Sequence, residues 1–456
     1  MNRYLVALLT VIVCAAPSFA AATDKPNIVL ILSDDQSWTD YSFMGHDVIK
    51  TPNLDKLAQR SAVFRRGYVP TALCRPSLMT LATGLYTHQH KVSGNDPSHV
   101  LAHPTKQAKK YAKLRADLIS HIDRQPTIAS LLGKQGYLSH QSGKWWEGNF
   151  KRGGFTHGMT RGFPQKGGRH GDDGLKIGRQ GMDPVFNFID ESVEADKPFF
   201  VWYAPFLPHS PHNPPERLLK KYRDKVDSPF VAKYYAMCEW FDETCGQLVE
   251  HIDKRGQTDN TLIVYICDNG WIQSPGSRKY AARSKQSANE GGVRQPTMFC
   301  WPGVVKPGDR GEQLCSSVDL VPTMLAAGGA NIPSALPGLN LLDNLNSGDP
   351  TPRKEVFGEG CAHDIRDIEK PEASLLYRWV VEGKWKLILT YDGEIGRYKS
   401  SHPRTEKRPQ LFDILADPHE KKNLAAMNPE VVARLSKKIA GWWKVEDRQV
   451  LTEWTE

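Results

Sequence analysis

Several features are missing from this sequence, and each absence narrows the range of functions. After the N-terminal segment no apolar run is long enough to cross a bilayer, so we expect no stable membrane insertion. No block of Lys and Arg is interleaved with aromatic residues, which argues against nucleic acid as a partner. What is present is a chain of 456 residues that is 40% hydrophobic, enough for a large catalytic domain with a smaller companion. Its net charge of +8 fits an anionic ligand.

Cysteine is scarce, with eight residues in the whole chain. Cys238 and Cys245 have no second pair at zinc-finger spacing beside them, so a structural zinc site is not expected. Once Cys14 of the N-terminal segment and Cys74 are set aside, six cysteines remain. These six can form disulfides outside the cytoplasm, although the sequence does not fix the pairs.

The N-terminal segment has the layout of an export signal. An early arginine precedes an apolar run over residues 5–16, and Ser18 and Ala20 have the small side chains that a signal peptidase requires. We therefore expect residues 1–20 to be removed. The soluble mature chain, which would begin near Ala21, would be periplasmic or secreted.

Three continuous apolar runs are typical of strands buried on both faces of a parallel sheet. They are Asn27–Leu32, Phe199–Ala204 and Leu262–Cys267. Helical stretches closed by glycine lie between and after them, at Thr127–Gln135 and Val318–Ala327. This alternation predicts an α/β fold, with ligands bound where the loops at the carboxyl ends of the strands converge.

A change in composition predicts two domains after the signal. Residues 333–352 are rich in Pro, Gly and Asn, and strand-like pieces follow on either side of a turn at Glu382-Gly383. We expect a catalytic domain over residues 21–345. A smaller, partly antiparallel C-terminal subdomain would occupy residues 346–456 and end in a helix.

Polar side chains with oxygen ligands follow two of the predicted strands: Asp34, Asp35, Asp268 and Asn269. Acidic residues at one strand end are usually just solvated. Two such pairs at matching positions instead favour a hard cation such as calcium or magnesium, because the carboxylates would otherwise repel one another.

The stretch TALCRPSLMTLATG places a cysteine at the start of a helix. Leu78, Leu81 and Ala82 recur at helical spacing, so Cys74 lies where the helix dipole favours an anion. Considered alone, Cys74 fits a core thiol, one half of a disulfide or a nucleophile. A buried core thiol is the commonest of these.

The same stretch resembles the activation motif of the formylglycine-dependent sulfatases, which reads Cys-x-Pro-Ser-Arg followed by Thr-Gly. Other segments occur in that family's order along nearly the whole mature chain: NIVLILSDDQ, GKWW, PFLPHSP, DNG, NEGGVRQP, SSVDLVPTML and LFDILADPHEKKNLA. The resemblance implies an alkaline-phosphatase-like fold, in which a mostly parallel sheet forms the middle of three α/β/α layers and an antiparallel sheet forms the C-terminal subdomain.

The resemblance also implies a mechanism. A formylglycine-generating enzyme would convert Cys74 into an aldehyde, whose hydrate attacks sulfur and later expels sulfate. Calcium would be bound by the four oxygen ligands and by the modified Cys74. Lys144 would contact the nucleophile and the sulfate, His209 would protonate the leaving group, and Lys285 would bind the sulfate. The implied reaction is hydrolysis of a sulfate ester, expected on a sulfated carbohydrate.

Three positions depart from the family pattern. Leu78 replaces the motif arginine, Trp146 replaces the histidine after Lys-Trp, and Gln286 replaces a frequent glycine. We expect Leu78 to pack in its helix, with Lys144 as a better source of the missing charge than Arg75. His88 or His90 is expected to fill part of the gap at Trp146.

An insertion over Lys106–Arg124 reads as an amphipathic helix with Lys109, Lys110, Lys113 and Arg115 beside an apolar stripe. Its basic face is either solvated or forms a wall that recognises a sulfated polysaccharide.

Two rival functions also stay open at this stage. One is a phosphomonoester or phosphonate hydrolase on the same scaffold, and the other is a catalytically silent protein that binds sulfated glycans.

Overall fold

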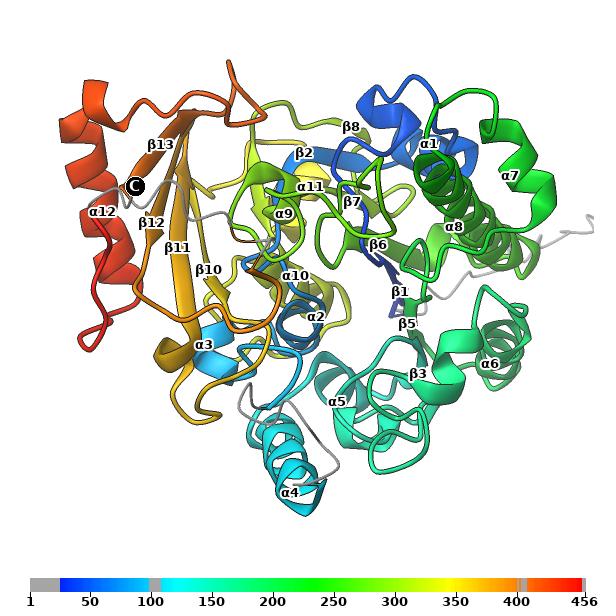
Figure 1. The fold of residues 1–456 in the computed structure, drawn as a ribbon. Helices are drawn as coiled ribbons and strands as arrows, with labels where there is room; N and C mark the ends of the chain where they lie inside the picture. Colours follow the sequence, from blue (N-terminus) through cyan, green and yellow to red (C-terminus); the bar gives the residue numbers. More distant parts are fainter. Residues whose placement is uncertain (1–24, 98–107, 400–401, 403–407, 453–456) are drawn as a thin grey trace, which may run out of the picture.

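The computed structural model describes residues 25–97, 108–399, 402 and 408–452 (Figure 1). The predicted signal at residues 1–20 lies outside this part of the chain, as does Lys106. Within the described residues, no helix has both the length and the apolar character needed to cross a membrane.

A sheet of nine strands forms the centre of the molecule, in the order β4-β3-β5-β1-β6-β7-β2-β8, with β9 also paired to β2. The strands are β1 (Asn27–Ser33), β2 (Ala62–Tyr68), β3 (Leu138–Gly143), β4 (His157–Gly158), β5 (Phe199–Ala204), β6 (Thr261–Cys267), β7 (Arg294–Cys300), β8 (Gly308–Asp309) and β9 (Leu314–Ser316). Only β7 runs antiparallel to its neighbours. The three predicted buried strands are β1, β5 and β6, and they lie side by side.

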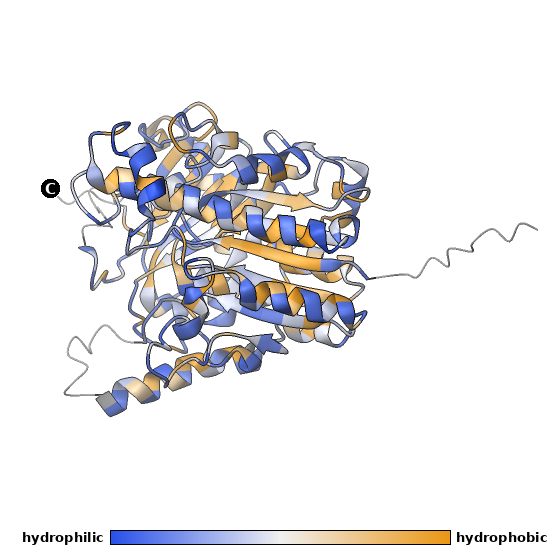
Figure 2. Cartoon of the chain, turned by 90° about the vertical axis from the view of Figure 1, so that its right-hand side faces the viewer, coloured by the Kyte–Doolittle hydropathy of each residue, from blue (hydrophilic) through white to orange (hydrophobic). Residues whose placement is uncertain are grey.

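Helices cover both faces of this sheet. Along β1, Ile28 and Leu30 point into one apolar core, whereas Val29 and Ile31 point into the other. The first core is closed by α2 (Cys74–Thr83), α5 (Ile128–Gly133), α10 (Leu320–Ala327) and α11 (Leu342–Ser347). The second is closed by α1 (Pro52–Gln59), α6 (Asp183–Glu194) and α8 (Pro229–Lys254). Figure 2 shows the orange, hydrophobic strands between helices whose outer faces are blue. The predicted three-layer α/β/α architecture is confirmed.

The C-terminal part adds a second sheet of four antiparallel strands, in the order β10-β11-β12-β13 (Figure 1). These are β10 (Glu355–Cys361), β11 (Leu375–Glu382), β12 (Trp385–Thr390) and β13 (Gln410–Asp413). The helix α12 (Pro429–Trp442) packs on one face through Leu435 and Ile439. The other face packs against residues of the large sheet and its loops, such as Tyr68 and Val293. The predicted antiparallel C-terminal sheet and its closing helix are therefore present.

The remaining helices are short or peripheral. They are α3 (Thr87–His90), α4 (Ala108–Ile119), α7 (Glu216–Tyr222) and α9 (Glu290–Val293). Short 3-10 helices occur at Ser42–Met44, Ser120–Arg124, Phe150–Gly153, Asp172–Lys176, Thr258–Asn260, Ser317–Asp319, Pro371–Ser374 and Ala425–Met427. Two predicted helices start later than expected. Thr127 caps α5, accepting from the Ser130 amide at 3.1 Å, and the segment before α10 forms a 3-10 turn.

The cysteines of the described chain form no disulfide, so the anticipated pairing of the six is not seen. All seven are buried as free thiols: Cys74, Cys238, Cys245, Cys267, Cys300, Cys315 and Cys361. Cys245 and Cys300, for example, belong to the apolar core beneath α8. These residues act as small apolar side chains in the core.

Candidate active site

The loops that follow four neighbouring strands meet at one edge of the large sheet. β3, β5, β1 and β6 are adjacent and parallel, so their carboxyl ends lie together. The Asp34 amide donates to the Leu207 carbonyl at 3.0 Å, and the Asp268 amide donates to the Ser33 carbonyl at 3.0 Å. The predicted convergence of the β1, β5 and β6 loops is therefore found. A pocket of about 510 Å³ opens above it.

Two lysines reach the carboxylates beneath this pocket. Lys144 Nζ lies 2.6 Å from Asp34 Oδ1 and 3.7 Å from Asp268 Oδ2. Lys285 Nζ lies 2.5 and 2.7 Å from the two oxygens of Asp35 and 3.0 Å from Cys74 Sγ. All six residues are buried. The structure thus brings together the predicted acidic residues, both predicted lysines and the predicted nucleophile.

Close backbone approach makes this arrangement possible at the end of β3. Gly143 has a φ of +83°, and a Cβ there would lie 1.8 Å from the Ala204 carbonyl oxygen. The next residue, Lys144, donates its amide to that same oxygen at 2.7 Å. Glycine is therefore required at this position for Lys144 to enter the pocket.

Asp35 occupies a strained but firmly held position. Its φ is +65°, a left-handed conformation that side-chain-bearing residues seldom adopt. Asn269 Nδ2 donates to Asp35 Oδ1 at 2.7 Å, and the Asp35 amide donates to Asp268 Oδ1 at 3.2 Å. Strain of this kind persists only where the surroundings fix it, and it is concentrated at functional sites.

Three of the predicted ligand oxygens have no hydrogen-bond partner among the described residues. They are Asp34 Oδ2, Asp268 Oδ2 and Asn269 Oδ1, all of them buried. Buried polar atoms normally find a partner, so three such oxygens on neighbouring loops require an explanation. A hard cation accounts for them, because calcium takes carboxylate and amide oxygens as ligands. Ligand atoms of Asp34, Asp35, Cys74 and His209 also lie within 4.8 Å of one another.

Burial and charge act against each other in this cluster. Burial raises the pKa of Asp34 well above its usual value, although Lys144 acts in the opposite direction. Burial also raises the pKa of Asp268. For Asp35 the effect of burial is outweighed by Lys285 and His209, which hold its pKa below the usual value. A positive charge near Asp34 and Asp268 would favour their ionised forms.

Cys74 is poorly suited to act as a plain thiolate. Its side chain is 2% exposed, and burial raises its pKa to about 12 even though Lys144 and Lys285 favour the anion. A thiol with this pKa is almost entirely protonated at neutral pH. Cys74 also forms no disulfide with any cysteine of the described residues.

Leu78 and Arg75 behave as the helix pattern predicts. Leu78 is 4% exposed and packs in the core beside Leu81, one turn of α2 further on. Arg75 Nε and Nη2 each lie 2.7 Å from a carboxylate oxygen of Glu147, in a buried ion pair. Because Arg75 is committed to Glu147, the positive charge beside Cys74 comes from the lysines.

His209 lies beside Asp35 at the edge of the pocket. Its Nε2 is 3.3 Å from Asp35 Oδ2, and its Nδ1 lies 2.6 Å from the Ser210 carbonyl oxygen, to which it donates. The ring stacks on Phe206 with centroids 4.2 Å apart. Burial holds the pKa of His209 well below its usual value, while Asp35 acts in the opposite direction. Because Nδ1 is committed to the carbonyl, only Nε2 is free to exchange a proton with a ligand.

The histidines expected to fill the gap at Trp146 do not reach it. His88 stacks on Trp443 with centroids 4.7 Å apart, and His90 Nε2 lies 3.2 Å from Thr80 Oγ1. Neither lines the pocket. The ring beside Trp146 is instead His170, 5.2 Å away between centroids.

His170 and its neighbour Arg169 were missed by sequence reasoning. Both line the pocket, and the Arg169 guanidinium lies 4.6 Å from the centre of the Trp146 ring. They belong to the irregular segment between β4 and α6, where no periodic pattern marks them. Their place depends on contacts with residues far away in the sequence, such as Trp146 and Asp96.

Comparison with known proteins relates the chain to one family. The family model described as Sulfatase matches residues 26–330. Arylsulfatase A of Bos taurus is 28% identical, over 93% of this chain and 88% of its own. Human N-acetylgalactosamine-6-sulfatase is 29% identical, over 92% of this chain and 85% of its own. The crystal structure of Ps i-CgsB in complex with k-i-k-neocarrahexaose superposes with a TM-score of 0.69 at 26% identity, covering 92% of each chain.

The third departure from the family motif has a visible conformational cost. Gln286, next to Lys285, has a φ of +66°, where glycine is unstrained. Its side-chain Nε2 donates to the Tyr280 hydroxyl, and its Oε1 lies 3.3 Å from His402 Nε2. These contacts compensate for the strain of a side-chain-bearing residue.

We predict that Gln286→Gly is more stable than Gln286→Ala by about 1 kcal/mol, because both lose the amide contacts but only glycine relieves the positive φ. Urea unfolding of the two variants and the wild type measures this difference. An alanine variant as stable as the glycine variant would show that φ is not a source of strain at this position.

Proposed function

The chain belongs to the sulfatase family and is a sulfuric ester hydrolase, and we propose that it uses a formylglycine made from Cys74 together with a calcium ion to release sulfate from a carbohydrate. One observation carries this proposal: Cys74 Sγ lies 3.0 Å from the Nζ of the buried Lys285, and ligand atoms of Cys74, Asp34 and Asp35 lie within 4.8 Å of one another. The names of the relatives support the substrate class, since one acts on a sulfated amino sugar and a structural neighbour binds an oligosaccharide.

The two lysines would bind the sulfate. Lys144 and Lys285 approach Cys74 from opposite loops, and both are almost fully buried. In a site that excludes water, their ammonium groups stabilise the negative charge on the sulfate oxygens far better than they would at the surface. Their fixed contacts with Asp34 and Asp35 hold them in place before the substrate binds.

The donor set suits the proposed metal. Asp34, Asp35, Asp268 and Asn269 would hold calcium together with the modified side chain at position 74, because all four offer hard oxygen ligands. When bound, the ion would lower the pKa of the nucleophilic hydroxyl supplied by formylglycine and would polarise the sulfate.

His209 would transfer the proton to the departing alcohol. Only Nε2 is available for this, so the imidazolium is the form that can donate, and Asp35 stabilises that form. The stacking on Phe206 keeps the ring facing the pocket.

The proposal includes export and maturation. The predicted signal at residues 1–20 would direct the chain out of the cytoplasm, and a formylglycine-generating enzyme would act on Cys74 before the site closes around it. In the finished fold Cys74 is 2% exposed, out of reach of another enzyme.

Peptide mass spectrometry tests the central step. In protein made with a formylglycine-generating enzyme, we expect the peptide with Cys74 to carry an aldehyde and the N-terminus to lie near Ala21. Sulfate release from sulfated saccharides should rise with the modified fraction and fall to background in Cys74→Ala. Aryl phosphate should be a much poorer substrate than aryl sulfate. Sulfate release by protein with only unmodified Cys74 would rule out this mechanism.

Calcium binding can be measured without turnover. We expect calcium at about 100 times its Kd to raise the free energy of unfolding by about 2.7 kcal/mol. Asp268→Asn should lose this gain, yet be no less stable than the wild type without calcium, because it removes one buried like charge. Asp123→Asn, which changes an exposed ion pair with Arg152, serves as the matched control and should respond to calcium normally. A full calcium response in Asp268→Asn would contradict the ligand assignment.

The role of His209 predicts a dependence on the leaving group. His209→Ala should reduce kcat/KM roughly 100-fold more for a sugar sulfate than for an activated aryl sulfate, because only the poor leaving group needs protonation. His212→Ala, a nearby ring that packs on Tyr234, should affect both substrates alike. Equal losses in His209→Ala would assign His209 to binding.

A further inference from the structure

The pocket above Cys74 is lined by an excess of positive charge. Six of its lining residues are Lys or Arg and none is Asp or Glu: Lys144, Arg169, Arg278, Lys279, Lys285 and Lys399. Lys144 and Lys285 lie at its buried base. The other four lie nearer to solvent, and in the described part of the chain Arg278, Lys279 and Lys399 have no ion-pair partner. This is more positive charge than one sulfate ester requires.

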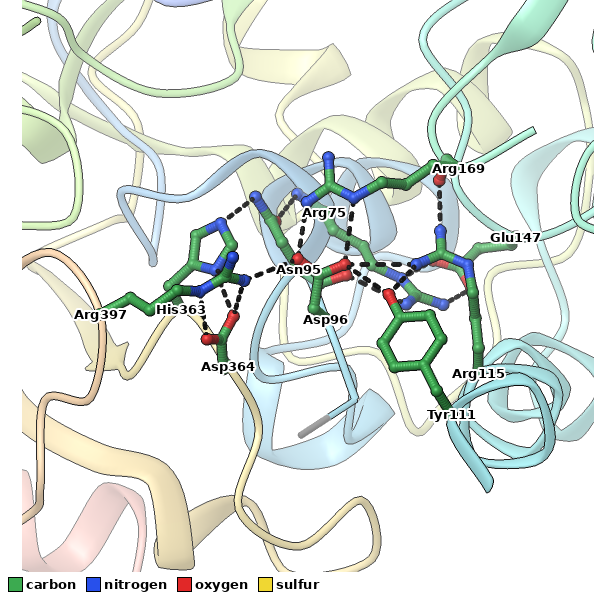
Figure 3. A network of polar contacts seen from close by, with 10 residues as sticks. All are labelled: Arg75, Asn95, Asp96, Tyr111, Arg115, Glu147, Arg169, His363, Asp364 and Arg397. Atoms are coloured by element: carbon green, nitrogen blue, oxygen red, sulfur yellow. Dashed lines mark hydrogen bonds and ion pairs between the residues drawn. The ribbon is translucent and has the colours of Figure 1, made fainter. Parts of the chain in front are cut away.

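Arg169 is the most firmly positioned of these outer cations. Its Nε and Nη2 donate to the two oxygens of Asp96 at 3.1 and 2.7 Å (Figure 3). Its guanidinium lies over Trp146, which stands where the family has histidine. The third nitrogen, Nη1, has no partner within the described residues. Arg169 therefore lines the pocket as a fixed, planar cation whose Nη1, with two N–H donors, is free.

Asp96 holds this arrangement together (Figure 3). It is 5% exposed, and it also faces Arg115 Nη1 at 3.3 Å, the Tyr111 hydroxyl at 3.3 Å and Arg397 Nη2 at 3.1 Å. Burial alone would raise the pKa of Asp96, but Arg169 and the other cations hold it below its usual value. The carboxylate is thus charged and fixed from several directions.

The inserted helix α4 contributes to the pocket through Arg115, which belongs to this network, and not through its exposed lysines. Arg115, expected on the basic face, is in fact 1% exposed and turns inward to Asp96. Lys109, Lys110 and Lys113 are exposed and do not line the pocket. The three lysines thus form an exposed face of α4 outside this pocket, as the first of the two interpretations of this helix expects.

A second metal site does not explain this network. Asp96, His363 and Asp364 each place a ligand atom within 4.8 Å of the others. However, Arg397 contacts both carboxylates, and Arg169 pairs with Asp96. These guanidinium groups already balance the negative charge.

We propose that Arg169 binds a second anionic substituent of the saccharide, a sulfate or a carboxylate that is not hydrolysed, and that Asp96 positions Arg169 for this contact. The proposal rests on the proposed function and narrows its substrate class to sugars with two anionic groups. Lys144 and Lys285 bind the sulfate that is cleaved, whereas the free Nη1 of Arg169 binds the second anionic group. A planar guanidinium suits either oxyanion, because both accept charge-assisted hydrogen bonds.

Three substrates test this: a sugar with one sulfate, the same sugar with two sulfates, and a disaccharide with one sulfate and one uronic acid. We expect wild type to prefer one or both of the dianionic substrates. In Arg169→Gln the ratio of kcat/KM for the preferred dianionic substrate to that for the monosulfate should fall about tenfold or more, mainly through KM. Comparison of the doubly sulfated sugar with the disaccharide that carries a uronic acid identifies whether the second anion is a sulfate or a carboxylate.

Asp96→Asn keeps the charge on Arg169 but weakens its support, so the same ratio should fall by a smaller factor. Lys113→Gln, on the exposed side of α4, is the matched control and should leave the ratio unchanged. An unchanged ratio in Arg169→Gln would overturn the proposal, as would a wild type without preference for either dianionic substrate.

Measurements of saccharide binding distinguish the proposed contact of Arg169 with a second anion, the anion site, from the proposed hydrolytic function. Calorimetry of Cys74→Ala with the same saccharides should show tighter binding of the preferred dianionic sugar, and Arg169→Gln in that background should abolish the difference. If wild type releases no sulfate but this binding preference persists, the proposed function fails and the anion site stands. If sulfate is released and Arg169 has no effect on either ratio, the anion site fails alone.

Discussion

Three like-charged carboxylates are buried together at the carboxyl ends of β1 and β6, and the rest of the pocket is organised around them. Asp34, Asp35 and Asp268 would repel one another strongly in a medium of low dielectric constant. Lys144 and Lys285 relieve part of this repulsion, and each comes from a different loop. The loop after β3 and the loop before α9 are therefore held in place by the same charge balance that prepares the site for an anion.

The sequence predicts the part of the site that is built on regular strands. Continuous apolar runs ending in polar residues identify β1, β5 and β6, and the parallel arrangement then brings Asp34 and Asp268 together. Arg169 is different, because its segment has no periodicity and its position depends on Asp96, far away in sequence. The spacing of apolar residues in α4 also does not reveal that Arg115 turns inward. A long basic side chain can extend to solvent or fold back to a buried carboxylate from the same position.

Each departure from the family motif is accommodated by local contacts. Leu78 fills the core of α2, where a charged residue would need a partner. Trp146 packs against His170, and the Arg169 guanidinium lies over the larger ring that stands here in place of histidine. These substitutions change the wall of the pocket while the charged residues at its base keep their arrangement.

A buried lysine links the small sheet to the pocket. Lys386 of β12 is fully buried, with its Nζ 2.9 Å from Glu290 of α9 and 3.2 Å from Glu420, and the Glu290 amide donates to Glu420 at 2.7 Å. Glu290 follows the loop that carries Lys285. On the ribosome, Asp35 is made near the beginning of the chain and Glu420 near its end. The loop that carries Lys285 can therefore reach its final contacts only after almost the whole chain has been made.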